Sequence, residues 1–170
     1  MLSLLHIENI AVIECADISF DRGFNVLTGE TGAGKSIVID AISAILGERA
    51  YRDMIRTGTN KASVRAVFTD VPKLSWFEDN GVDYDPETVI HREVYLDGKN
   101  VCRVNGSLVT VSILRQLGLQ LINIHGQHDS ASLFDEDNHL ILLDAYAENS
   151  DLREQYSVKF NKVCALRKEI

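Results

Sequence analysis

The feature that most constrains this chain is a glycine-rich segment near its N-terminus. Gly29, Gly34, Lys35 and Ser36 match the spacing G-x-x-x-x-G-K-[ST], in which the backbone N–H groups turn inward and form a nest for phosphate oxygens. The motif normally joins a strand to a helix, and the helix N-terminus adds positive partial charge. The chain is therefore predicted to be an α/β domain of the P-loop class that binds a nucleoside triphosphate.

The sequence on both sides of the loop agrees with this prediction. Residues 24–28 (FNVLT) are typical of a short strand. Residues 35–46 are apolar nearly all round, which predicts a helix buried at the centre of the domain and ended by Gly47. We expect Lys35 to bridge the β- and γ-phosphates and the Ser36 hydroxyl to ligate Mg²⁺. The other residues predicted to contact the nucleotide here are Glu30, Thr31, Gly32, Ala33 and Ile37.

Short strands and helices are predicted along the rest of the chain. The strands cover residues 2–9, 16–20, 62–69, 89–96, 100–105 and 119–124, and the helices cover residues 74–80, 109–117 and 137–147. Asp97-Gly98-Lys99 is a good hairpin signal. The helix of residues 109–117 is expected to end at Gly118.

A polar loop after the strand of residues 119–124 carries a second candidate site. Gln127 lies where a polar side chain reaches a γ-phosphate, its Mg²⁺ or the attacking water. It is therefore predicted, with Lys35, to be catalytic and, with Ser36, to contact the metal; the alternative is a glutamine that faces solvent. The neighbouring polar residues are interpreted as loop-stabilising or solvated rather than as metal ligands: His125, His128 and Asp129.

The carboxylates that an ATPase needs are harder to find. They normally follow an apolar strand that ends in Asp, often with a catalytic Glu next to it. Residues 140–144 (LILLD) imitate such a strand, but residues 135–138 (DEDN) form a helix-start signal and no Glu follows Asp144. The helical interpretation is favoured, so the chain is expected to hold the nucleotide without the main carboxylates for hydrolysis.

Charge and cysteine content narrow the function further. A net charge of −8 argues against a free-standing nucleic-acid binder. One region is locally basic and is interpreted as solvated surface: Arg49, Arg52, Arg56, Lys61 and Arg65. The sparse cysteines form no CxxC pair, which fits a reducing cytoplasm and predicts no metal site there. No apolar stretch is long enough to cross a bilayer, so no membrane partner is expected.

The pattern changes near residue 149. Apolar residues then recur at near-heptad spacing with charges between them: Leu152, Tyr156, Phe160, Val163 and Ile170. We predict a domain over residues 1–148 and the beginning of a coiled-coil arm over residues 149–170. Because the pattern reaches the last residue without a cap, we expect the chain to be a fragment that ends within a long helix.

Several of these segments resemble a known family. Residues 7–10 (IENI), the loop of residues 29–36 and residues 40–42 (DAI) resemble the N-terminal half of the ATPase head of SMC (structural maintenance of chromosomes) proteins. A bacterial DNA-repair branch of that family is similar in four segments: residues 28–36 (TGETGAGKS), 55–58 (IRTG), 104–106 (VNG) and 124–128 (IHGQH). The resemblance spans nearly the whole chain, and IHGQH after that P-loop is its most specific part.

The resemblance implies an ABC/SMC-type N-terminal head lobe, with a mixed β-sheet around a central helix and with ATP and Mg²⁺ as cofactors. It matches Gln127 to the Q-loop glutamine, which senses Mg²⁺ and the γ-phosphate, and Arg56 to an arginine near the nucleotide. It also implies that the C-terminal head lobe supplies the signature motif, the Walker B carboxylate and the catalytic glutamate. The full-length protein is then expected to be an ATPase, and this piece is expected to bind ATP without turnover.

The same resemblance implies a homodimer of heads that encloses two ATP molecules and acts on DNA double-strand ends in break repair and recombination. A cytoplasmic, nucleoid-associated protein is expected. An ABC transporter nucleotide-binding domain shares the P-loop and Q-loop, but it predicts no coiled coil after them. A DNA-bridging head that binds ATP without hydrolysis remains open, and a small-molecule kinase would need a lid and a Walker B strand of its own.

Overall fold

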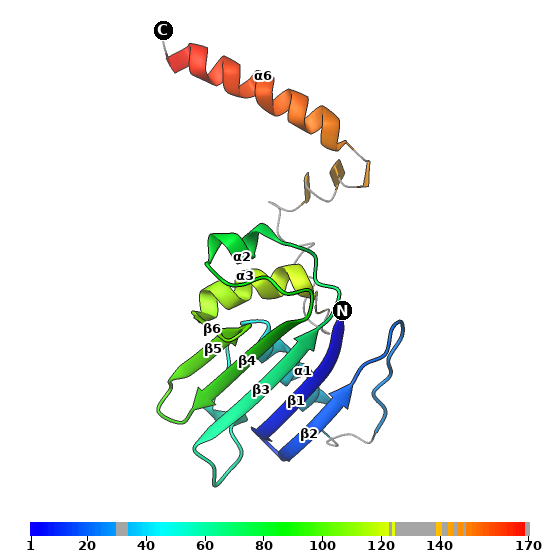
Figure 1. Cartoon of the computed structure of the whole chain (residues 1–170), viewed down its shortest axis with the longest axis vertical. Coiled ribbons are helices and arrows are strands. Elements are labelled where there is room, and N and C mark those ends of the chain that lie inside the picture. Colours follow the sequence, from blue (N-terminus) through cyan, green and yellow to red (C-terminus); the bar gives the residue numbers. More distant parts are fainter. Residues whose placement is uncertain are drawn as a thin grey trace. The chain divides into compact units, whose positions relative to one another are not determined.

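The computed structural model describes residues 1–29, 34–122, 124, 139–140, 143–144, 146–147 and 149–168. The chain divides into two compact units, residues 1–123 and residues 124–170. Among the described residues, the first unit contains a six-stranded sheet with the order β2-β1-β3-β4-β5-β6 (Figure 1).

Every pair of neighbouring strands in this sheet is antiparallel. The strands are β1 (Leu2–Ile10), β2 (Ile13–Ser19), β3 (Lys61–Phe68), β4 (Thr88–Tyr95), β5 (Asn100–Val104) and β6 (Ser107–Val109). The sheet was expected to be mixed, but over the described residues it is not. Strand β6 was not predicted: it follows a turn at Asn105 and Gly106, whose φ angles of 49° and 84° suit a tight hairpin.

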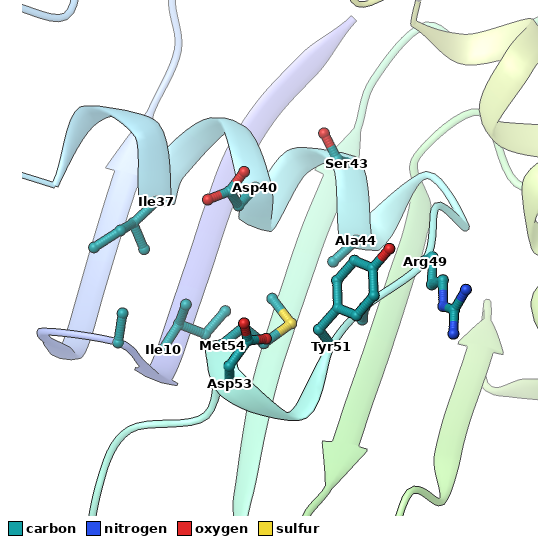
Figure 2. Close-up of a pocket in the computed structure, with 11 residues that line it drawn as sticks. Ile10, Ile37, Asp40, Ser43, Ala44, Arg49, Tyr51, Asp53 and Met54 are labelled. Carbon is teal, nitrogen blue, oxygen red and sulfur yellow. The ribbon is translucent and has the colours of Figure 1, made fainter.

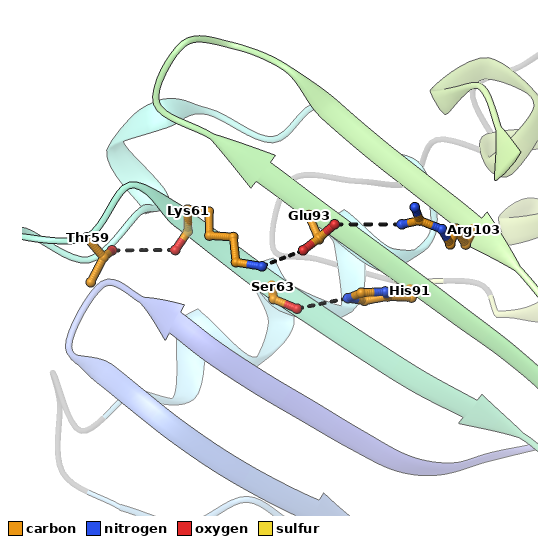
Figure 3. Close-up of polar contacts among 6 residues, drawn as sticks. All are labelled: Thr59, Lys61, Ser63, His91, Glu93 and Arg103. Carbon is orange, nitrogen blue, oxygen red and sulfur yellow. Dashed lines mark hydrogen bonds and ion pairs between the residues drawn. The ribbon is translucent and has the colours of Figure 1, made fainter. Parts of the chain in front are cut away.

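The two faces of the sheet differ in polarity because side chains alternate along each strand. Leu5, Ile7, Val64 and Ile90 are among those buried on the inner face, where the predicted central helix, α1 (Lys35–Ile45), packs against β1, β3 and β4 (Figure 1). The outer face is polar (Figure 3). There the Lys61 Nζ atom lies 2.6 Å from Glu93 Oε1, and the Ser63 Oγ atom lies 3.0 Å from His91 Nε2.

The other helical segments of the first unit are η1 (Arg52–Met54), α2 (Ser75–Asp79) and α3 (Val111–Leu121). Thr110 caps α3, because its side chain accepts a hydrogen bond from the backbone N–H of Ile113 at 3.2 Å. The indole N–H of Trp76 donates to the carbonyl oxygen of Ile113 at 3.1 Å, which joins α2 to α3. Gly47, with φ of 87°, ends α1 as predicted.

The prediction of a strand over residues 24–28 is wrong for this chain. The segment joins neither edge of the described sheet, and the side chains of Phe24, Val26 and Leu27 are 93%, 61% and 44% exposed. An apolar run becomes a strand only when a neighbour can take up its N–H and C=O groups. Neither β2 nor β6 pairs with it.

The prediction of a strand over residues 119–124 is also wrong in its first half, because α3 continues through Gly118 to Leu121. Gly118 does not end the helix. A Cβ atom on Gly118 would overlap the carbonyl oxygen of Leu46, so glycine is present to let α3 approach the end of α1.

In the second unit, α6 (Ser150–Lys168) confirms a helix in the tail. The described residues of the 137–147 segment include His139, Leu140, Leu143 and Asp144, which are helical. The Asp144 Oδ2 atom lies 3.8 Å from Arg153 Nε. Asp144 therefore belongs to a helix and a local ion pair, as the helical interpretation predicted. The start of an arm at residue 149 stays a prediction.

Candidate functional site

The N-terminal end of α1 is suited to binding an anion. Gly34 precedes the helix with φ of 90° and ψ of 0°, a left-handed conformation that glycine adopts readily. Within the described part of the chain, no side chain caps this end, and the first turn holds no acidic residue. Among the described residues, therefore, no carboxylate of the first turn competes for its N–H groups or for the positive end of the helix dipole.

Lys35 connects the two ends of the glycine-rich motif. Its Nζ atom donates a hydrogen bond to the carbonyl oxygen of Gly29. Ser36 follows in the first turn of α1 with an exposed side chain. The structure thus brings Gly29, Gly34, Lys35 and Ser36 together at the start of one helix. The predicted contacts Glu30, Thr31, Gly32 and Ala33 lie outside the described residues.

Arg56 lies against the turn that joins β1 to β2. Its Nη1 atom donates a hydrogen bond to the carbonyl oxygen of Val12 at 2.9 Å. The turn includes Ala11 at φ of 46°, a conformation that is uncommon outside glycine and that recurs at functional sites. The Cδ1 atom of Ile13 would lie 3.9 Å from a Cβ atom on Gly34. The turn that holds Arg56 therefore borders the start of α1.

A pocket of about 350 Å³ extends along α1 from this border (Figure 2). The apolar side chains of Ile10, Ile37 and Met54 line it, together with the carboxylates of Asp40 and Asp53. Asp40 lies on the side of α1 that faces the segment of Asp53 and Met54 (Figure 2). Apolar walls with carboxylate acceptors suit a flat ring that carries an amine.

Sequence reasoning identified Ile37 but missed the rest of this pocket. Asp40 and Asp53 lie on α1 and η1, and only the fold brings the two segments together. The one signal was the spacing of Ile37 and Asp40, three residues apart on a helix and therefore on one face.

The locally basic region is partly neutralised by contacts within the fold. The Arg52 Nη2 atom donates to the carbonyl oxygen of Asp97 at 3.3 Å, and Lys61 pairs with Glu93 (Figure 3). The hydrogen bond between Lys61 and Glu93 raises the pKa of Lys61 and lowers the pKa of Glu93. The Arg49 Cζ atom lies 5.1 Å from the centre of the Tyr51 ring. These contacts favour the earlier interpretation as ordinary protein surface.

The second candidate site is the polar loop after residue 124. Gln127, His125, His128 and Asp129 lie outside the described residues. Among the residues that the structure describes, no group of three or more His, Cys, Asp or Glu side chains lies close enough together to hold a metal ion.

Comparison with known proteins decides the family. The family model described as "AAA domain" matches residues 4–169. The chain belongs to the AAA domain family. It is also 47% identical over 151 residues to the DNA repair protein RecN of Bacillus subtilis (strain 168), an alignment that covers 86% of this chain and 26% of that protein. The chain therefore spans about a quarter of that relative's length.

Solved structures show that this AAA-domain chain has the fold of the N-terminal lobe of an SMC head. One is described as "Structural biochemistry of ATP-driven dimerization and DNA stimulated activation of SMC ATPases". It is similar to this chain with a TM-score of 0.62 at 25% sequence identity, and the alignment covers 84% of this chain and 97% of the solved chain. The Smc head domain with an extended coiled coil, bound to the C-terminal domain of ScpA and derived from Pyrococcus furiosus, has a TM-score of 0.70 at 22% identity. The alignment covers 99% of this chain and 47% of that Smc head chain.

These findings confirm the resemblance to SMC heads and to their bacterial DNA-repair branch, and they do not favour the transporter alternative. Membership of the AAA domain family implies ATP binding. The described helices include none that is long and apolar enough to cross a membrane.

Proposed function

We propose that this chain binds MgATP at the N-terminal end of α1, as the N-terminal lobe of an SMC-like ATPase head that acts in DNA double-strand break repair. The observation that carries the proposal is the junction of Gly34 and Lys35 at the start of a helix whose first turn holds no acidic residue. Lys35 exchanges its bond to the Gly29 carbonyl for phosphate oxygens. The Ser36 hydroxyl supplies a ligand to Mg²⁺.

The pocket beside α1 suits the base of the nucleotide. It begins at Ile37, the residue after Ser36, so a base bound there stays within reach of phosphates at the helix start. Asp40 or Asp53 accepts a hydrogen bond from the exocyclic amine of adenine. Guanine in the same pose presents a carbonyl oxygen to that carboxylate, and the pocket therefore favours ATP over GTP.

Hydrolysis requires more than this chain. We propose that Arg56, which contacts the β1–β2 turn, approaches the nucleotide. We also propose that Gln127 contacts Mg²⁺ and the γ-phosphate. The chain's own C-terminal head lobe would supply the remaining carboxylates. In the full-length protein, two paired heads would then hydrolyse ATP, and this hydrolysis would drive the action of the protein on DNA ends in the nucleoid. The similarity to the DNA repair protein RecN supports this part, and ATP binding without turnover is expected of the chain alone.

Calorimetric titration of the chain with MgATP tests the proposal, with GTP as a second titrant. We expect binding by the wild type, and Lys35→Ala to weaken it by roughly tenfold or more, because a charge-assisted bond to phosphate is lost. Lys73→Ala is the matched control: Lys73 pairs with Glu78 at 2.9 Å, and its replacement should leave affinity unchanged. Equal ATP affinity in wild type and Lys35→Ala, or no binding at all, would contradict the proposal.

A further inference from the structure

One buried cation is not used by the proposed nucleotide site. Arg92 on β4 is 2% exposed and is the one charged side chain that the described part of the chain buries. Its neighbours two residues away on the strand, Ile90 and Val94, are also buried. The Arg92 Nη1 atom donates to the carbonyl oxygens of Ala44 and Glu48, both at 2.6 Å. The Ala44 oxygen lies in the last turn of α1 and the Glu48 oxygen just beyond it, at the end of the helix opposite the P-loop.

The other side of the guanidinium bonds to the neighbouring strand. Arg92 Nη2 and Nε donate to Oδ1 of Asn100 on β5, at 3.0 and 3.3 Å. These partners are neutral oxygens, while the side chain of Glu48 lies 3.3 Å from Arg115 Nη2. A buried guanidinium is costly without compensation, and here the negative end of the α1 dipole and the nearby Glu48 carboxylate supply it. Burial lowers the pKa of Arg92.

Helix α3 holds the same end of α1 through close backbone contact. A Cβ atom on Gly47 would overlap the backbone nitrogen of Arg115, and one on Gly118 would overlap the carbonyl oxygen of Leu46. The C-terminal end of α1 is thus held by α3 and by Arg92. Helices are stiff, so the position of this end and the packing of α1 on β1, β3 and β4 together set the direction of the whole helix.

The length of α1 turns a small tilt into a large error at the P-loop. Its 11 residues span about 16 Å at 1.5 Å per residue. A tilt of about 5° at the C-terminal end therefore moves the first turn by about 1.4 Å. A displacement near 1 Å is enough to spoil a bound geometry.

We propose that Arg92 is a positioning residue for the triphosphate. By holding the C-terminal end of α1, it sets where the first-turn N–H groups and the Lys35 ammonium meet the phosphates. The inference rests on the proposed function, because it places the triphosphate at the opposite end of α1.

The test compares variants of the whole chain in two measurements: MgATP affinity by calorimetry, and hydrogen exchange without nucleotide of the first bonded amides of α1, from Val38 onward. Arg92→Met should lower affinity by roughly tenfold or more and speed exchange. Arg92→Lys keeps a donor for the carbonyls but not the guanidinium fork, so it should restore affinity to within roughly threefold of wild type. Asn100→Ala leaves the bonds to α1 in place and should stay within about twofold.

Phe77→Leu in α2 is the matched control for general destabilisation. Phe77 is 1% exposed and packs on Trp76 and Tyr84, so the variant should lower thermal stability without changing either readout. Wild-type affinity and exchange in Arg92→Met would overturn the inference, and so would equal losses in Phe77→Leu. If Arg92→Met does not fold, Arg92→Gln takes its place in the comparison with Phe77→Leu, and wild-type affinity and exchange in Arg92→Gln would overturn the inference. If the wild type binds no ATP, the proposed function fails, and the exchange comparison still decides the role of Arg92.

Discussion

At the scale of single residues, His91 shows how the sheet sets the chemistry of a side chain. It lies on the outer face of β4, where its Nε2 atom is 3.0 Å from Ser63 Oγ (Figure 3). Burial lowers the pKa of His91 below its ordinary value of 6.5; Glu93 opposes this shift, while Arg65 adds to it. The folded chain therefore favours neutral His91.

This shift makes stability depend on pH in a stated direction. Well above pH 6.5, His91 is neutral in both states, and the folded state keeps its full stability. As pH falls below that value, the unfolded state binds the proton first, so the free energy of unfolding declines until the pH passes below the lowered folded pKa.

We expect His91→Gln to remove this dependence while keeping an acceptor for Ser63. The measurement is urea unfolding of both proteins at about pH 7.5 and about pH 5, where the difference between wild type and variant should shrink or reverse at the lower pH. Titrating groups that do not interact with His91 affect both proteins alike and cancel in that difference. A difference that is the same at both pH values would show that the histidine is not responsible.

At the scale of elements, the contact between α1 and α3 depends on two glycines for different reasons. Gly47 has φ of 87° and also meets the backbone of Arg115. Gly118 is helical, and its contact with the Leu46 carbonyl is what excludes a side chain. The sequence correctly predicted Gly47 as a helix end. It predicted the same role for Gly118, but α3 continues past that residue.

We expect Gly47→Ala to destabilise the chain more than Gly81→Ala, measured by thermal and urea unfolding. Both glycines have positive φ, but a Cβ atom on Gly81 meets nothing within 4 Å. The Gly81 variant therefore measures backbone strain alone. The additional loss of unfolding free energy in Gly47→Ala, about 2 kcal/mol, reports the forced separation of α1 from α3. Equal losses in the two variants would argue against close packing at this junction.

At the scale of the whole molecule, the chain exposes apolar surface in each unit. In the second unit, α6 carries a stripe that is about half exposed or more: Leu152, Tyr156, Phe160, Val163 and Leu166. Tyr156 and Phe160 stack on each other at 5.9 Å between ring centres. In the first unit, the segment of residues 24–28 is similarly open. Apolar patches of this kind usually mark surfaces that bind other protein segments.

We therefore expect the isolated chain to self-associate with increasing concentration. Sedimentation velocity at about 10 and about 100 µM should show a larger species at the higher concentration. Tyr156→Ser combined with Phe160→Ser should reduce it, whereas the pair Gln155→Ser and Lys159→Ser on the same helix should not. A monomer at both concentrations, or equal effects of the two pairs, would rule out the stripe as the cause.

Local sequence was sufficient for the parts of this protein that depend on neighbouring residues. Alternation predicted β3, the hairpin signal of residues 97–99 predicted the strand before it, β4, and the Gly34-Lys35-Ser36 spacing predicted the helix start. Each of these signals depends only on residues close together in the sequence. The strand predicted for residues 24–28 failed, because a strand also requires a partner from elsewhere.

Only the tertiary structure decided which distant residues meet. The alternation of β4 placed Arg92 on the inner face beside Ile90 and Val94, yet nothing in the sequence named its partners, the carbonyls of Ala44 and Glu48. The same holds for Asp40 and Asp53, which share a pocket. Local patterns set the conformation of a segment and the face of each side chain, but the approach of two segments follows from packing the first unit around its core.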